Sequence, residues 1–141
     1  EKYGFEVAIG EKDKDITESR GLALNEKTGY IAVSEEYAKT IAHKLGTTPH
    51  IIKGWFSDTL PRYKEEIGPI ALLRLDGDTY SSTMEALTIL YDNVVKGGIV
   101  VVDDYHDFSG CREALYNFFN ERGIAPALEH YPFGRVYFRK G

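Results

Sequence analysis

Two almost continuously apolar runs dominate the hydrophobic pattern of the chain, at Ile70–Leu75 and at residues 99–102. Such runs are typical of strands buried on both faces of a parallel sheet. Between them, apolar positions recur at helical spacing over residues 82–95, and Gly97-Gly98 is expected to end that helix. The three segments therefore predict a right-handed β-α-β crossover that joins two adjacent parallel strands.

Helical spacing also marks two further segments. Residues 35–45 follow Ser34, a good helix cap, and precede Gly46, a residue that commonly ends helices. A second helix is expected over residues 110–122, with Gly123 as its stop. One of these helices precedes the crossover in the sequence and the other follows it, so helices and strands alternate along the chain.

The remaining segments are shorter. The pattern predicts a strand at residues 50–54, a turn at 59–61 and a short helix or loop at 62–67. Two apolar stretches at residues 128–131 and 135–138, on either side of Pro-Phe-Gly, indicate an antiparallel hairpin. The fold class is therefore α/β, with a mostly parallel sheet and a C-terminal antiparallel hairpin.

Composition supports one packed domain and narrows the partners. The chain has 141 residues, of which 43% are hydrophobic and 13% aromatic. A net charge of −5 without clustered basic residues argues against nucleic acid as a partner. No apolar run approaches the ~18 residues of a membrane span. The single cysteine, Cys111, excludes an intrachain disulfide and fits a reducing compartment, so we expect a cytoplasmic protein.

Acidic residues follow both strands of the crossover. Asp76 comes directly after the first strand, and Asp103 and Asp104 come directly after the second. Ligands of open α/β sheets bind outside the carboxyl ends of the strands, where these three carboxylates should converge and repel one another. Hard oxygen ligands suit Mg²⁺ or another divalent cation of that kind, so the pattern predicts a metal site.

Neighbouring polar residues have alternative roles. Asp78 or Ser81 could cap the helix that begins near Ser82, or Asp78 could take part in chemistry. His106 follows the acidic pair and is either a proton acceptor or a loop histidine near the site. The catalytic candidates are Asp76 and His106.

Several linked motifs are similar to those of a known family. In order, these are Gly54-Trp-Phe-Ser-Asp-Thr-Leu-Pro61, Leu73-Arg-Leu-Asp-Gly-Asp-Thr-Tyr-Ser-Ser-Thr-Met84, Gly97-Gly-Ile-Val-Val-Val-Asp-Asp-Tyr105 and Gly110-Cys-Arg112. Together they closely resemble the macrocin O-methyltransferase family over about residues 34–140. Members are S-adenosylmethionine-dependent enzymes that methylate sugar hydroxyls of natural products.

The resemblance implies a Rossmann-like class I methyltransferase sheet, S-adenosylmethionine as cofactor and a divalent ion, usually Mg²⁺. It implies metal ligands at Asp76, Asp103 and Asp104. It also implies a cofactor site that includes Gly54, Trp55, Phe56 and Asp76, with an aromatic ring stacked on adenine. The acceptor would be a small molecule, expected to be a sugar.

The amino-terminal segment departs from the family pattern, because no glycine-bearing cofactor loop precedes Ser34. We favour residues 1–33 as a lid-like segment, with residues 34–141 as the C-terminal part of a methyltransferase domain that lacks its first strands. The alternative makes residues 5–10 and 30–33 degenerate strands, with Glu35 or Glu36 as ribose ligand. A missing first strand would expose a sheet edge, which predicts pairing with a second copy or with residues 3–10.

Other functions remain open at this point. An Asp-Gly-Asp after a strand also occurs in haloacid dehalogenase-type phosphatases, where Asp76 would be the nucleophile. An Asp-x-Asp pair can serve a glycosyltransferase, and an excised half-domain would catalyse nothing.

Overall fold

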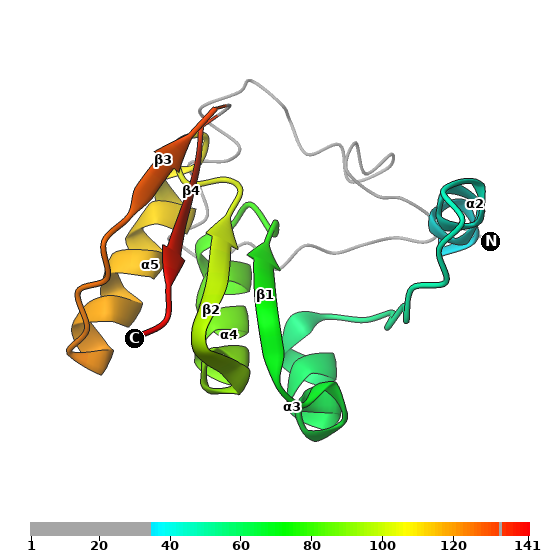
Figure 1. The fold of residues 1–141 in the computed structure, drawn as a ribbon, viewed down its shortest axis with the longest axis horizontal. Helices are drawn as coiled ribbons and strands as arrows, with labels where there is room; N and C mark the ends of the chain where they lie inside the picture. The colour runs from blue at the N-terminus through cyan, green and yellow to red at the C-terminus, as the bar shows by residue number, and fades with distance from the viewer. Residues whose placement is uncertain (1–34, 133) are drawn as a thin grey trace.

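The structure is a computed structural model that describes residues 35–132 and 134–141 (Figure 1). Its centre is a mixed four-stranded sheet in the order β1-β2-β4-β3. The strands are β1 (Ile70–Leu75), β2 (Val94–Val102), β3 (Glu129–Tyr131) and β4 (Arg135–Arg139). The segment at residues 1–33, with its lid and strand alternatives, lies outside the described residues.

The central pairing of the sheet confirms the expected crossover. β1 and β2 are adjacent and parallel, with Leu73 opposite Val100 and Leu75 opposite Val102. β4 runs antiparallel to β2 and to β3, so the predicted C-terminal hairpin is also confirmed. The fold is α/β with a mixed sheet.

With one exception, the helices of the described residues pack on one face of this sheet (Figure 1). They are α3 (Phe56–Ile67), α4 (Tyr80–Leu90) and α5 (Ser109–Arg122); α2 (Glu35–Lys44) stands apart from the sheet. The largest fully buried side chains come from both layers and include Leu87, Val100, Val102, Leu115, Phe118, Val136 and Phe138. Phe138 meets Phe119 of α5 edge-on, at 5.1 Å between ring centroids.

One expectation about burial is wrong. β1 is not buried on both faces, because Leu73 and Leu75 are buried while Leu72 is 61% exposed. The alternation follows from the pleat, which sends successive side chains to opposite faces. The described helices cover one face, so the apolar residues of β1 on the other face stay exposed.

The crossover helix is shorter than predicted. α4 ends at Leu90, a 3-10 turn covers Tyr91–Asn93, and β2 already begins at Val94. Gly97 and Gly98 therefore lie inside β2, where the register against β1 shifts between Ile70 and Leu72. A Cβ on Gly98 would lie 2.8 Å from the Val95 carbonyl oxygen, so glycine permits this irregularity rather than ending a helix.

The segment before β1 also differs from expectation. Residues 50–54 form no strand, and α3 runs through residues 59–61 instead of a turn. The Trp55 carbonyl accepts bonds from the backbone N–H and hydroxyl of Thr59, at 2.9 and 2.7 Å, and these complete the first helical turn. The first turn of α3 is therefore already formed when the chain reaches Pro61, and the helix continues through this residue although proline has no backbone N–H to donate.

A lysine ties the end of β4 to the crossover. The Lys140 ammonium donates to the carbonyls of Tyr91, Asp92 and Val94, at 3.0, 3.2 and 2.8 Å. It also lies 4.8 Å from the centre of the Tyr91 ring. Its three protons thus bind three carbonyls at the junction between the 3-10 turn and β2, where the Tyr91 carbonyl also accepts from the Val94 N–H.

We expect Lys140→Met to lower the free energy of unfolding by about 1.5–3 kcal/mol, the range for hydrogen bonds that involve a charged group. Urea denaturation followed by circular dichroism measures the change. Lys96→Met, at an exposed position of β2, is the control and should change stability little. Equal denaturation midpoints for Lys140→Met and the wild type would contradict this role.

Candidate functional site

The parallel pairing brings the carboxyl ends of β1 and β2 to one rim of the sheet. The Asp103 N–H donates to the Leu75 carbonyl at 2.9 Å, which extends the strand pairing to the last residue of β1. Asp76 and Asp104, the next residues along the two segments, therefore leave the sheet side by side. This is the edge at which the sequence predicted a ligand site.

The turn after β1 is fixed by its own side chains. Thr79 caps α4, and its side chain and that of Ser82 bond reciprocally to each other's backbone N–H. Ser82 also donates its hydroxyl to the Gly77 carbonyl at 2.6 Å. The cap is therefore Thr79, and the expectation that Asp78 or Ser81 caps this helix is wrong.

Asp78 has a different place in that turn. Its backbone is left-handed, with φ +63°, and its N–H donates to the Asp104 Oδ2 at 3.1 Å. Asparagine and aspartate are the non-glycine residues that tolerate this conformation best. Asp78 is thus held against Asp104, which the sequence did not indicate.

Three carboxylates converge at the rim. Asp76, Asp78 and Asp104 each offer an oxygen, and these oxygens lie within 4.8 Å of one another. Asp104 is buried, and this burial, together with the negative charge of Asp78, raises its pKa to about 7. A cation would stabilise these carboxylates, because they repel one another and are partly shielded from water. Their oxygen atoms are the ligands that a hard divalent ion prefers.

The Asp103 side chain contacts arginines rather than the other carboxylates of the rim. Its carboxylate forms ion pairs with Arg74, at 2.9 Å, and with the Arg135 side chain. Burial alone would raise the pKa of Asp103, but hydrogen bonds from Arg135 and Arg74 outweigh it and hold the pKa below its ordinary value. Of the three expected metal ligands, Asp76 and Asp104 lie together, and Asp103 belongs to the arginine cluster.

His106 lies outside the carboxylate group. Its ring nitrogen Nε2 is 3.1 Å from Nδ1 of His130, and its ring meets Tyr105 edge-on. The His106 N–H donates to the Gly134 carbonyl, so the residue borders the β3–β4 hairpin. Its side chain is exposed, beside the rim rather than within it.

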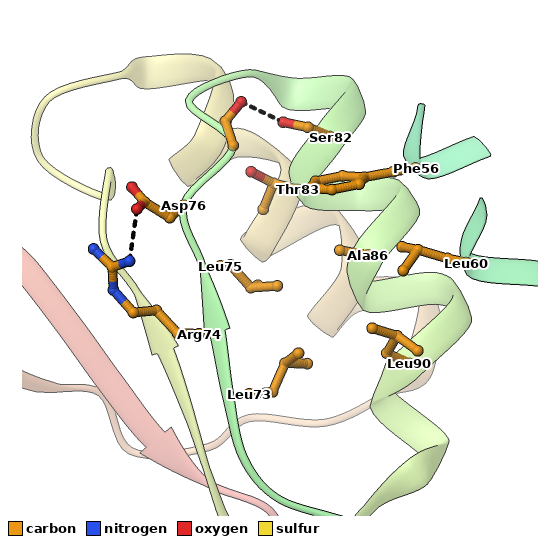
Figure 2. A pocket seen from close by; sticks show the side chains of 11 residues that line it. Phe56, Leu60, Leu73, Arg74, Leu75, Asp76, Ser82, Thr83, Ala86 and Leu90 are labelled. Carbon is orange, nitrogen blue, oxygen red and sulfur yellow. Dashed lines mark hydrogen bonds and ion pairs between the residues drawn. The ribbon is translucent and has the colours of Figure 1, made fainter. Parts of the chain in front are cut away.

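A cavity of about 180 Å³ opens between β1, α3 and α4 (Figure 2). Leu73 and Leu75 point into it from β1, and Phe56 and Leu60 close it from α3. Asp76 and Gly77 line its end next to the carboxylates. Of the residues expected at the cofactor, Phe56 and Asp76 line this cavity.

Gly54 and Trp55 lie beside it. Trp55 is 51% exposed and precedes α3 as its cap residue. Gly54 has φ +145°, and a Cβ there would lie 2.6 Å from the Thr59 methyl group. Gly54 is therefore required by the approach of α3, whatever else it contacts.

A comparison with protein families shows which family the chain belongs to. The model of the macrocin O-methyltransferase family (TylF) matches residues 5–140, nearly the whole chain. The chain belongs to this family. The match also begins well before residue 34, where the sequence motifs had placed the start of the likeness.

The chain is similar to a demethyldecarbamoylnovobiocin O-methyltransferase of Streptomyces niveus, which is 36% identical over 86% of this chain and 47% of its own length. Another is an 8-demethyl-8-(2,3-dimethoxy-alpha-L-rhamnosyl)-tetracenomycin-C 4'-O-methyltransferase of Streptomyces olivaceus, 33% identical over 85% of this chain and 46% of its own. The chain spans about half the length of these curated relatives.

Solved structures agree in fold. The O-methyltransferase NovP superposes with a TM-score of 0.74 at 35% identity, over 86% of this chain and 50% of NovP. The calicheamicin methyltransferase CalS11 superposes with a TM-score of 0.63 at 24% identity, over 82% of this chain and 51% of its own. No helix among the described residues is long and apolar enough to span a membrane.

The raised pKa of Asp104 predicts a pH-dependent stability. The folded-state pKa of about 7 exceeds the value of about 3.9 for an unfolded aspartate, so the folded protein binds more protons between these pH values. Stability should therefore fall as the pH rises through this window when divalent ions are chelated. We expect Asp104→Asn to raise the melting temperature at pH 8 and to lose this advantage towards pH 4, as measured by differential scanning calorimetry.

Asp92→Asn is a control of opposite sign. A hydrogen bond from Arg122 lowers the pKa of Asp92, so this carboxylate stabilises the fold when it is ionised. Its removal should lower the melting temperature slightly at pH 8, because the pair is exposed. If Asp104→Asn also melts below the wild type at pH 8, the account of Asp104 is wrong.

Proposed function

We propose that the protein to which this chain belongs is an O-methyltransferase that transfers a methyl group from S-adenosylmethionine to a hydroxyl of a sugar or glycosylated natural product, with help from a divalent cation. The convergence of Asp76, Asp78 and Asp104 at the ends of two parallel strands, in a member of this family, carries the proposal. A Rossmann-like class I sheet is supported by the parallel pair and the antiparallel hairpin beside it.

The metal would be held at the rim by Asp76 and Asp104, with Asp78 as a further oxygen donor. Asp103, predicted as the third ligand, would have to give up contacts with Arg74 and Arg135 to bind the ion directly. A divalent ion such as Mg²⁺ supplies Lewis acidity that makes a hydroxyl easier to deprotonate. The residues of the rim fix the position of that charge and orient the acceptor.

The cofactor would supply the methyl group and would lie next to the rim. The cavity beside Asp76 and Gly77 has an apolar lining that includes Phe56 and suits a flat aromatic ring. Its volume of about 180 Å³ is below the ~300–1,000 Å³ of typical ligand pockets. The described residues therefore fit a part of S-adenosylmethionine.

The acceptor proton would pass to a side chain at the rim. Asp78 belongs to the carboxylate group and its turn is rigid, which favours it on geometry. His106 stays a candidate from the other side of the rim, where its hydrogen bond to His130 orients the ring. Among the relatives, the tetracenomycin enzyme has a rhamnosyl group in its name, which supports a sugar as acceptor.

The family match favours methyl transfer over the phosphatase and glycosyltransferase alternatives. Asp76 is 46% exposed in its side chain and pairs with Arg74 at 2.6 Å. A guanidinium on this oxygen would compete with its use as a nucleophile. The remaining alternative is a half-domain that binds metal without catalysing a reaction. An assay of methyl transfer from S-adenosylmethionine to a glycosylated acceptor distinguishes it from an active enzyme.

The metal site predicts a selective loss of affinity. Asp76→Asn should weaken Mg²⁺ binding by about tenfold or more, since even outer partners of a metal site contribute that much. Isothermal titration calorimetry measures the dissociation constant. Asp92→Asn removes the same charge from a site at the other end of the strands and should leave affinity unchanged. Equal affinities for Asp76→Asn and the wild type would remove the metal from the proposal.

The partial cofactor pocket predicts weak binding by this chain alone. S-adenosylhomocysteine should bind with an affinity weaker than micromolar, because the described cavity can enclose only part of it. Calorimetry in the presence of Mg²⁺ tests this. Micromolar binding would contradict this prediction.

A further inference from the structure

Arg74 joins the two strand ends that carry the acidic residues. It lies on β1 between Leu73 and Leu75, and its side chain points to the opposite side of the strand from the cavity (Figure 2). One terminal nitrogen is 2.6 Å from Asp76 Oδ2, and the other is 2.9 Å from Asp103 Oδ1. A single guanidinium therefore bridges the carboxylates that follow β1 and β2.

Asp76 is shared between this guanidinium and the carboxylate group. It belongs to the group of Asp76, Asp78 and Asp104 and also has an ion pair with Arg74. Asp103 has a second partner in Arg135 and would stay neutralised without Arg74. Asp76 has no such second partner in the salt bridges of the described residues. The contact between Arg74 and Asp76 is thus the point at which the two charge systems meet.

We propose that Arg74 is a built-in counter-cation that competes with the divalent ion for Asp76. Without metal, Arg74 links Asp76 to Asp103 and offsets the repulsion among the carboxylates. When the ion binds, Arg74 withdraws from Asp76 and keeps its contact with Asp103. This inference rests on the proposed metal site and adds a residue that lowers its affinity.

The chemistry of arginine makes this competition unavoidable. The guanidinium stays protonated at all relevant pH values, so it cannot lose its charge when a metal approaches. A neighbouring positive charge repels the ion and occupies a carboxylate oxygen that the ion could use. The Arg74 side chain is 51% exposed, so solvent offers it room to move. A monovalent ion that displaced Arg74 from Asp76 would bring the same positive charge as the guanidinium. A divalent ion brings one more positive charge, so it stabilises the carboxylates better than Arg74 does.

Mn²⁺ binding measured by electron paramagnetic resonance tests the proposal directly. Arg74→Met keeps much of the aliphatic stem and removes the charge, and it should tighten Mn²⁺ binding about tenfold. Arg74→Lys keeps the charge but can reach only one carboxylate, so its affinity should lie between those of Arg74→Met and the wild type. Arg62→Met, on the exposed side of α3, is the matched control and should bind Mn²⁺ as the wild type does.

The melting temperature, measured with and without Mg²⁺, is a second test, and it also applies if a variant folds poorly. Without metal, Arg74→Met should melt below the wild type, because the carboxylates lose their counter-cation. Saturating Mg²⁺ should raise its melting temperature more than it raises that of the wild type. If Arg74→Met is unfolded without metal, the same comparison with Arg74→Lys decides, since Lys preserves the charge.

The outcomes separate this inference from the proposed function. If the wild type binds Mn²⁺ and Arg74→Met binds it equally or more weakly, Arg74 is no competitor and the metal site itself stands. If neither protein binds Mn²⁺ at millimolar concentration, the metal site and the role of Arg74 both fail. Tighter binding by Arg74→Met, with Arg62→Met unchanged, supports the inference.

Discussion

The parallel pairing of β1 with β2 is the constraint on which the site depends. It brings Asp76 and Asp104 to one rim although the whole of α4 separates them in sequence. The backbone bond from Asp103 to Leu75 extends the pairing to the point where the carboxylates begin. The core beneath it, with Leu75 and Val102 buried, holds the two strand ends at a fixed separation. The acidic rim is therefore a consequence of topology before it is a matter of individual side chains.

The rim is electrostatically costly for the folded chain. Three carboxylates meet where Asp104 is already buried, and the structure offsets this in two ways. A backbone N–H from Asp78 bonds to Asp104, and Arg74 pairs with Asp76. Among the residues that the structure describes, four carboxylates lie with two guanidinium groups at this edge, and a divalent cation would offset the excess negative charge. Such clustering lowers the stability of the folded chain, a cost that is common at binding sites.

Sequence reasoning predicted the framework of the fold and a large part of the rim. Periodicity located α2, α5, the parallel pair and the hairpin. In α5, β1, β2 and β4 the regular apolar positions include the buried ones, whereas Ala42 is the buried residue of α2 and β3 is exposed. It misplaced the end of α4, since Tyr91 and Val94 continue a helical spacing while they belong to a 3-10 turn and a strand. Strand-end position found Asp76 and Asp104. It could not find the turn of Asp103 towards Arg74 and Arg135, because Arg135 comes from the hairpin and meets Asp103 only in three dimensions.

The left-handed backbone of Asp78 restricts how this position can vary among related chains. A φ of +63° is comfortable for glycine, tolerable for aspartate and asparagine, and unfavourable for branched or bulky side chains. Glutamate would preserve the charge, but it lacks the local hydrogen bonding that helps aspartate to adopt this conformation. Sequence drift at this position is therefore directed towards glycine and asparagine, the two residues that keep the turn and discard the carboxylate. A family member with either residue there would retain the fold and the helix cap while it loses one negative charge from the rim.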